Sequence, residues 1–163
     1  MKLLRIAVCI LSVALAATAW AESDAQKSFR QLTTLAGSWE GKGMGNKPVQ
    51  VSFRVVSNGS AVMSEIQGDE DMITMFHLDG DRLMMTHYCA TGNQPRMLGT
   101  MSPDGKTLTF DFLDVTNLAG TPGHMQHLVF TITDANHHSE EWTFLDKDGT
   151  KQMHEHFELQ RKP

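Results

Sequence analysis

The sequence is short of cysteine and of long apolar runs. It has two cysteines among 163 residues, and one of them, Cys9, lies in the apolar beginning of the chain. Cys89 is the only cysteine after this apolar beginning, which we predict below to be a signal peptide that is removed. We therefore expect no internal disulfide and a fold stabilised by core packing. No apolar run reaches the roughly 20 residues that a membrane-spanning helix needs, and we expect no span in the mature chain.

Basic residues are also few. There are 14 Lys and Arg against 19 Asp and Glu, and two of the basic residues fall within the first five positions. No basic stripe and no interleaving of basic with aromatic residues is present. We therefore expect no nucleic-acid partner.

The start of the chain has the organisation of a signal peptide. Two basic residues precede an apolar run over residues 6–17, and the tripeptide "AWA" then places small residues where a signal peptidase reads them. We predict a signal peptide over residues 1–21, one domain over residues 22–163 with a net charge of −7, and a periplasmic or secreted protein.

The sequence of residues 22–163 predicts one helix followed by strands. Ser23 suits the N-cap of a helix over residues 23–35, with Phe29, Leu32 and Leu35 on one face. Beyond it, alternating segments are separated by short turn signals such as "NG", "DG" and "PDG". The predicted strands are residues 38–45, 48–57, 60–68, 71–78, 82–90, 95–102, 106–115, 124–133, 137–146 and 151–160.

Short turns make neighbouring strands antiparallel, and a meander of this length avoids open edges by closing on itself. The predicted fold is all-β, a ten-stranded up-and-down antiparallel β-barrel closed by a short N-terminal helix.

The two ends of this β-region resemble the calycin superfamily of lipocalins, fatty-acid-binding proteins and their relatives. "LAGSWEGKG", residues 35–43, opens the first strand after a short helix, and "FELQRKP" ends the chain just beyond the last strand. The resemblance implies that Trp39 closes the barrel base and that Arg161 packs over its indole. Ten strands fit the fatty-acid-binding and nitrobindin-like branches better than the lipocalins.

Alternation predicts which side chains of the late strands point inward. One face of residues 137–146 carries His138, Glu140, Trp142 and Phe144, and one face of the last strand carries Glu155 between apolar residues. Leu108, Phe110 and Phe112 form the apolar face of another strand, with Asp111 on its outer face.

The stretch "THYCATGNQPRM", residues 86–97, gathers polar side chains at the end of one strand and the turn after it. Alternation allows His87 and Cys89, or else Tyr88, to face the interior. The register depends on the preceding Asp79-Gly80 turn. A two-residue loop pairs Phe76 with Leu83 and is preferred; a three-residue loop would bring His77 to the face of His87.

The function that these features favour is binding of a small hydrophobic or amphipathic molecule in the cavity, without catalysis. The expected ligand-binding residues are His87, Cys89, Tyr88, Arg96, Glu140, Glu155 and Trp142. A purely structural alternative is that the polar residues only tie the barrel rim together by hydrogen bonds.

Three further alternatives stay open. Cys89 and His87 could act as a nucleophilic pair, or, with His154 and His156, as metal ligands. The nitrobindin resemblance implies haem through a histidine late in the chain, where His154 and His156 match, although alternation places both outside. We expect no cofactor, with haem as the alternative. The late strands carry no arginine except Arg161, so a fatty acid is not favoured, and the inward carboxyls indicate a neutral or cationic ligand or internal hydrogen bonds.

Overall fold

A computed structural model describes residues 21–68 and 70–163. The predicted signal peptide therefore lies almost entirely outside the described residues. The secondary structure consists of helix α1 (Asp24–Thr33), the 3-10 turns η1 (Met44–Asn46) and η2 (Ser57–Gly59), and strands β1 (Gly37–Lys42), β2 (Pro48–Val56), β3 (Ala61–Gln67), β4 (Met72–Asp79), β5 (Arg82–Tyr88), β6 (Gln94–Met101), β7 (Thr107–Thr116), β8 (Gly123–Asp134), β9 (His137–Asp146) and β10 (Gln152–Arg161). No helix in the described ranges is long and apolar enough to cross a membrane.

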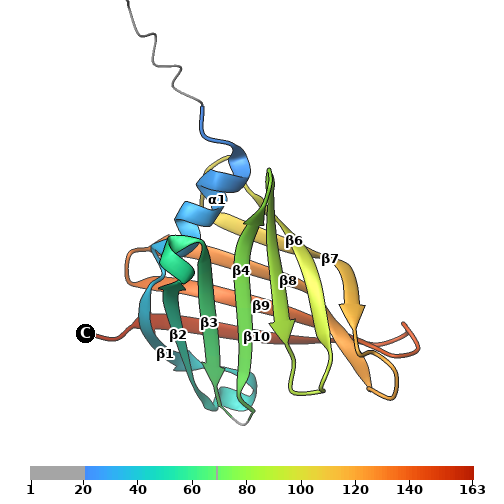
Figure 1. The fold of residues 1–163 in the computed structure, drawn as a ribbon. Helices are drawn as coiled ribbons and strands as arrows, with labels where there is room; N and C mark the ends of the chain where they lie inside the picture. The colour runs from blue at the N-terminus through green and yellow to red at the C-terminus, as the bar shows by residue number, and fades with distance from the viewer. Residues whose placement is uncertain (1–20, 69) are drawn as a thin grey trace, which may run out of the picture.

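The ten strands form one closed antiparallel barrel, as predicted (Figure 1). Each strand pairs with its neighbour in the sequence, and β1 closes the ring by pairing with β10 on one side and β2 on the other. The meander thus leaves no open sheet edge along the ring.

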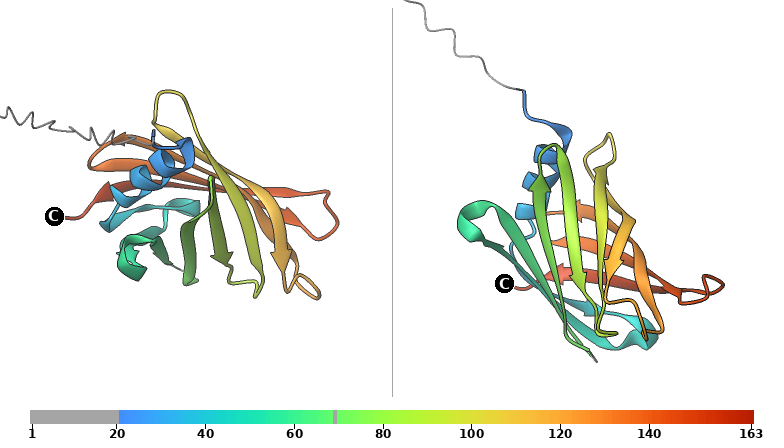
Figure 2. Two further views of the ribbon diagram at one scale, coloured as in Figure 1. Left: turned by 45° about the horizontal axis from the view of Figure 1, so that its top comes forward. Right: turned by 45° about the vertical axis from the view of Figure 1, so that its right-hand side comes forward.

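Helix α1 covers one end of the barrel, which Figures 1 and 2 show from three directions. Ser23 begins it with a capping box: its hydroxyl accepts from the backbone of Gln26, whose side chain accepts from the backbone of Ser23. Leu32 and Leu35 are at most 1 % exposed and close this end of the barrel from inside.

Trp39 and Arg161 lie where β1 meets β10, and the contact implied by the resemblance is confirmed. The two residues are paired across the strands, and the guanidinium carbon lies 4.2 Å from the indole centroid. Arg161 also donates hydrogen bonds to the carbonyl oxygens of Thr34, Ala36 and Ala135. This arginine therefore joins the end of α1 and the residue before β1 to the β8–β9 turn.

Aromatic rings fill the half of the barrel nearest α1. Phe53, Phe76, Phe110 and Phe130 are at most 1 % exposed, and their neighbouring ring centroids lie 5.3 to 6.2 Å apart. The contacts are tilted or edge-to-face, the arrangement that aromatic pairs prefer. The described side chains of this half therefore form a packed core.

Phe112 departs from the inward face expected for it. The side chain is 41 % exposed, because the pairing of β7 with β8 ends at Asp111. Beyond that point the strands separate, and the ring stacks on His124 with centroids 4.4 Å apart.

The turn between β4 and β5 corrects both predicted registers. Asp79 pairs with Arg82, so the two-residue loop is Gly80-Asp81 and Phe76 lies opposite Met85 instead of Leu83. Gly80 has a φ of 60° in the first loop position, which suits a type II′ turn, and the Arg82–Asp79 ion pair closes the hairpin. The shift is two residues, so the faces are unchanged, and His77 lies on the other face of the sheet from His87, as the preferred register required.

Candidate functional site

A cavity of about 730 Å³ occupies the end of the barrel away from α1. The strand ends and connecting loops at this end form its mouth. Its lining comprises Gly43, Gly45, Lys47, Pro48, Val49, Ile66, Gly68, Glu70, Met72, Cys89, Thr91, Pro122, Met125, Trp142, Phe144, Met153, His154, Glu155 and Phe157. Most of the side chains are apolar, and the charged ones are few.

One wall of the cavity is made by β9 and β10 and combines aromatic rings with a carboxylate. Trp142 lies directly opposite Glu155 across the strands, and Phe157 follows Glu155 on the same face. The third ring, Phe144, lies opposite Met153 at the mouth. Alternation predicted these inward faces, and the rings are at most 8 % exposed.

Gly43 provides the space against this wall. A methyl group at its Cα would come within 2.7 Å of a Glu155 carboxylate oxygen and 2.9 Å of the Phe157 ring. The glycine backbone therefore lies directly against the carboxylate and the ring, and a larger residue would displace them.

A row of buried polar side chains, linked by hydrogen bonds, holds the Trp142 indole in position. The indole N–H donates to Oε2 of Glu140 at 3.0 Å, and Oε1 of Glu140 lies 3.3 Å from Nε2 of His138. The His138 ring in turn packs edge-on against Trp39, with centroids 4.2 Å apart. Glu140 thus fixes the orientation of the cavity indole and does not itself line the cavity.

His87 lies behind Trp142, with ring centroids 4.7 Å apart. Its side chain is 0 % exposed, and Nδ1 is hydrogen-bonded to the Thr74 hydroxyl at 2.9 Å. Nε2 has no hydrogen-bond partner among the described residues. Burial lowers the pKa of His87 from its ordinary 6.5 to about 4, so the imidazole is neutral at physiological pH.

The turn after β5 brings Cys89 and Thr91 to the cavity. Cys89 is half-buried, and its backbone bonds to Asn93 and Gly92 shape the turn. The side chain of Asn93 is buried and donates to the Thr121 hydroxyl and the Gly123 carbonyl. Asn93 therefore ties two rim loops together, as expected if the polar residues of this stretch only bond the barrel rim.

Tyr88 and Arg96 lie away from the cavity. Tyr88 is 50 % exposed on the outer face of β5, opposite Ile73. Arg96 forms a bidentate ion pair with Asp114 on β7. The structure thus brings Cys89, Trp142 and Glu155 of the predicted set to the cavity, keeps His87 and Glu140 behind it, and places Tyr88 and Arg96 outside.

Several lining residues could not be predicted from the sequence. The η1 loop, Gly68, Glu70 and Pro122 reach the mouth only because the barrel closes. Met125 was hidden by a bulge: the register of β8 and β9 shifts between Met125 and His127. The extra residue, Gln126, reverses the alternation that points Leu128 inward.

A haem group would need an imidazole nitrogen directed into the cavity. Nδ1 of His154 lies 3.1 Å from the Thr143 hydroxyl, and His156 contacts Glu141 at 3.4 Å and Glu158 at 2.8 Å. His156 thus contacts carboxylates of the outer barrel surface and does not fit an axial role, whereas His154 borders the mouth of the cavity with Nδ1 engaged by Thr143.

His87 and the acidic side chains of the described ranges offer no metal site. His87 is separated from the cavity by the Trp142 indole, which packs against it at a tilt. Within residues 21–68 and 70–163, no three His, Cys, Asp or Glu side chains come together in a way that could hold a metal ion.

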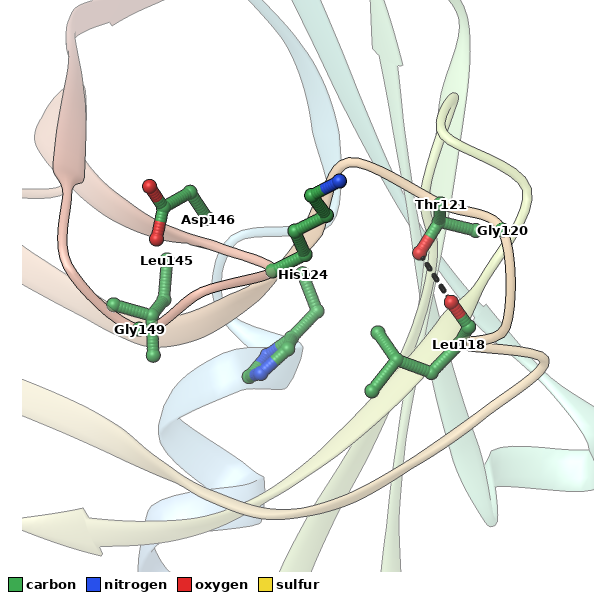
Figure 3. A pocket seen from close by; sticks show the side chains of 8 residues that line it. Leu118, Gly120, Thr121, His124, Leu145, Asp146 and Gly149 are labelled. Carbon is green, nitrogen blue, oxygen red and sulfur yellow. Dashed lines mark hydrogen bonds between the residues drawn. The ribbon is translucent and has the colours of Figure 1, made fainter.

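A smaller hollow of about 410 Å³ lies outside the barrel, between the β7–β8 loop and the β9–β10 turn (Figure 3). Two of its polar side chains are engaged by local structure. The Thr121 hydroxyl donates to the Leu118 carbonyl, and the Asp146 carboxylate accepts from the Thr150 backbone. Backbone N–H groups of Lys151 and Thr150 hold the pKa of Asp146 below its usual value.

Comparison with protein-family profiles and with curated proteins gives no match. Among solved structures, the chain is similar to Rv2717c from M. tuberculosis, with a TM-score of 0.57, 19 % identity, and coverage of 83 % of this chain and 98 % of that one. It is also similar to a protein of unknown function of the DUF3598 family from Nostoc punctiforme, with a TM-score of 0.54 and 9 % identity. That match covers 80 % of this chain and 49 % of the other. Both similarities concern the barrel fold.

Proposed function

We propose that this protein is an exported calycin-type barrel that binds one small apolar or amphipathic molecule in the cavity, without converting it. The observation that carries the proposal is the cavity itself. Its volume of about 730 Å³ lies within the roughly 300–1,000 Å³ of small-molecule sites, and it has an apolar lining with a few polar groups. Barrels of this size commonly hold a single small ligand.

The positions of Cys89 and His87 favour binding over catalysis. A nucleophile is activated when a neighbouring base accepts its proton. Nε2 of His87 makes no hydrogen bond to the Cys89 thiol or to any other described group, and Nδ1 is taken by Thr74. The export part of the proposal rests on the basic and apolar beginning of the sequence.

The test is uptake of N-phenyl-1-naphthylamine, a fluorescent apolar probe, by wild type and by two matched variants. Met72 on β4 lines the cavity, whereas Met75 on the same strand lies on the other face, opposite Met63 and Thr86. Met72→Trp adds volume inside the cavity, and Met75→Trp makes the same change outside.

We expect saturable binding of one probe per chain by wild type and by Met75→Trp, and at least a tenfold loss of affinity in Met72→Trp. Circular dichroism and the melting temperature establish that each variant folds. Equal probe binding by both tryptophan variants, or none by the wild type, would overturn the proposal.

A further inference from the structure

Two carboxylates lie around the cavity. Glu70 and Glu155 line it, together with the basic side chains of Lys47 and His154. Glu155 is half-buried and lies within the apolar wall, whereas Lys47 is exposed. The charged side chain within the apolar wall is therefore a carboxylate.

The groups around Glu155 are those that attract an organic cation. Trp142 lies across the strands from it, Phe157 next to it on the same face, and Phe144 diagonally across. An aromatic face attracts a cation through its quadrupole, most strongly for tryptophan, and the attraction grows in a desolvated site. A carboxylate among such rings adds charge pairing in surroundings that water screens weakly.

The indole is held in place before any ligand arrives. Its N–H donates to Glu140, and one side of it packs against His87. Both supporting side chains are 0 % exposed. A wall that is already ordered loses little conformational freedom when a ligand binds, which favours affinity.

We propose that the ligand is an amphipathic organic cation, with its ammonium-type head against Glu155 and Trp142 and its apolar part along Val49, Ile66 and Met72. This inference rests on the proposed function and specifies the ligand class of the same cavity. It explains why a barrel interior carries a carboxylate where a fatty-acid carrier would need basic side chains.

The experiment compares three probes with the same twelve-carbon chain, each below its micelle concentration: dodecyltrimethylammonium, dodecyl sulfate and dodecanol. Each displaces N-phenyl-1-naphthylamine from the wild type, from Glu155→Gln and from Glu158→Gln. Glu158 lies on the same strand but faces solvent beside His156, so it is the matched control for loss of one carboxylate.

We expect the wild type and Glu158→Gln to bind the ammonium probe at least about tenfold more tightly than the sulfate or the alcohol. Glu155→Gln should lose that preference and keep its affinity for dodecanol. Equal affinity for the three probes, or preference for the sulfate, would overturn the cation assignment and leave the binding function standing. Binding of none would overturn both.

The wild-type ranking decides the question even if Glu155→Gln does not fold. A second readout locates the head group: dodecylpyridinium quenches indole fluorescence on contact, so its binding should quench the wild type strongly. Trp142→Phe should bind this probe more weakly and, at saturating probe, lose most of the quenching. Undiminished quenching in this variant would place the head group elsewhere.

Discussion

The buried imidazole of His87 should make the stability of the protein depend on pH. The side chain is 0 % exposed, and burial holds its pKa at about 4 instead of 6.5. In the unfolded chain the same imidazole gains a proton as the pH falls through about 6.5, while in the folded barrel it stays neutral down to about 4. Over that interval the unfolded state binds more protons, so acidification lowers the free energy of unfolding.

The magnitude follows from the width of the interval. About 1.4 kcal/mol per pH unit between 6.5 and about 4 gives a loss of about 3 kcal/mol from His87. This is a large share of the 5–15 kcal/mol typical of a folded domain. Above pH 6.5 the contribution is fully present, and below about pH 4 it changes no further.

Urea unfolding at several pH values between 7.5 and 4 measures this effect. Glutamine at position 87 has an acceptor for Thr74 but takes up no proton, so His87→Gln should remove about 3 kcal/mol of the pH dependence. His77→Gln, on the outer face of β4, controls for the same replacement elsewhere on this strand pair. Identical pH slopes in wild type and His87→Gln would refute the reasoning.

Three further predictions concern the seam and the cavity. Arg161→Met removes the cation over the indole and three hydrogen bonds to carbonyl oxygens, and should lower the free energy of unfolding by about 2 kcal/mol in urea titrations. Gly41→Ala should lower the melting temperature by several degrees, because its Cβ would lie 1.9 Å from the Glu158 carbonyl oxygen, whereas Gly68→Ala meets nothing within 4 Å and should not. Bound N-phenyl-1-naphthylamine should slow modification of Cys89 by a bulky thiol reagent; an unchanged rate would place the probe outside the cavity.

Much of the barrel could be predicted from local sequence, because alternation and turn residues act at short range. The inward face of β9 is an example: His138, Glu140 and Trp142 are all at most 3 % exposed, as their spacing indicates. The seam between Trp39 and Arg161 was predicted from a short motif and a terminal arginine, and the geometry confirms it.

The site was less predictable, because loops and small register changes decide it. The predicted loop, Asp79-Gly80, lies one residue before the observed loop, Gly80-Asp81. The strand pairing therefore differs by two residues, while each side chain stays on its predicted face of the sheet. One inserted residue in β8 brought Met125 into the cavity against the alternation. Tyr88 is close to His87 in the sequence, but strand geometry sends it to the opposite face.

The central claim is that the cavity holds a small molecule, and native mass spectrometry of protein purified gently from the cells that make it tests this most directly. The account predicts a fraction with the mass of the chain plus one small molecule, which organic solvent releases and Met72→Trp fails to retain. A wild-type protein with only the bare chain mass, which also takes up no apolar probe, would contradict it.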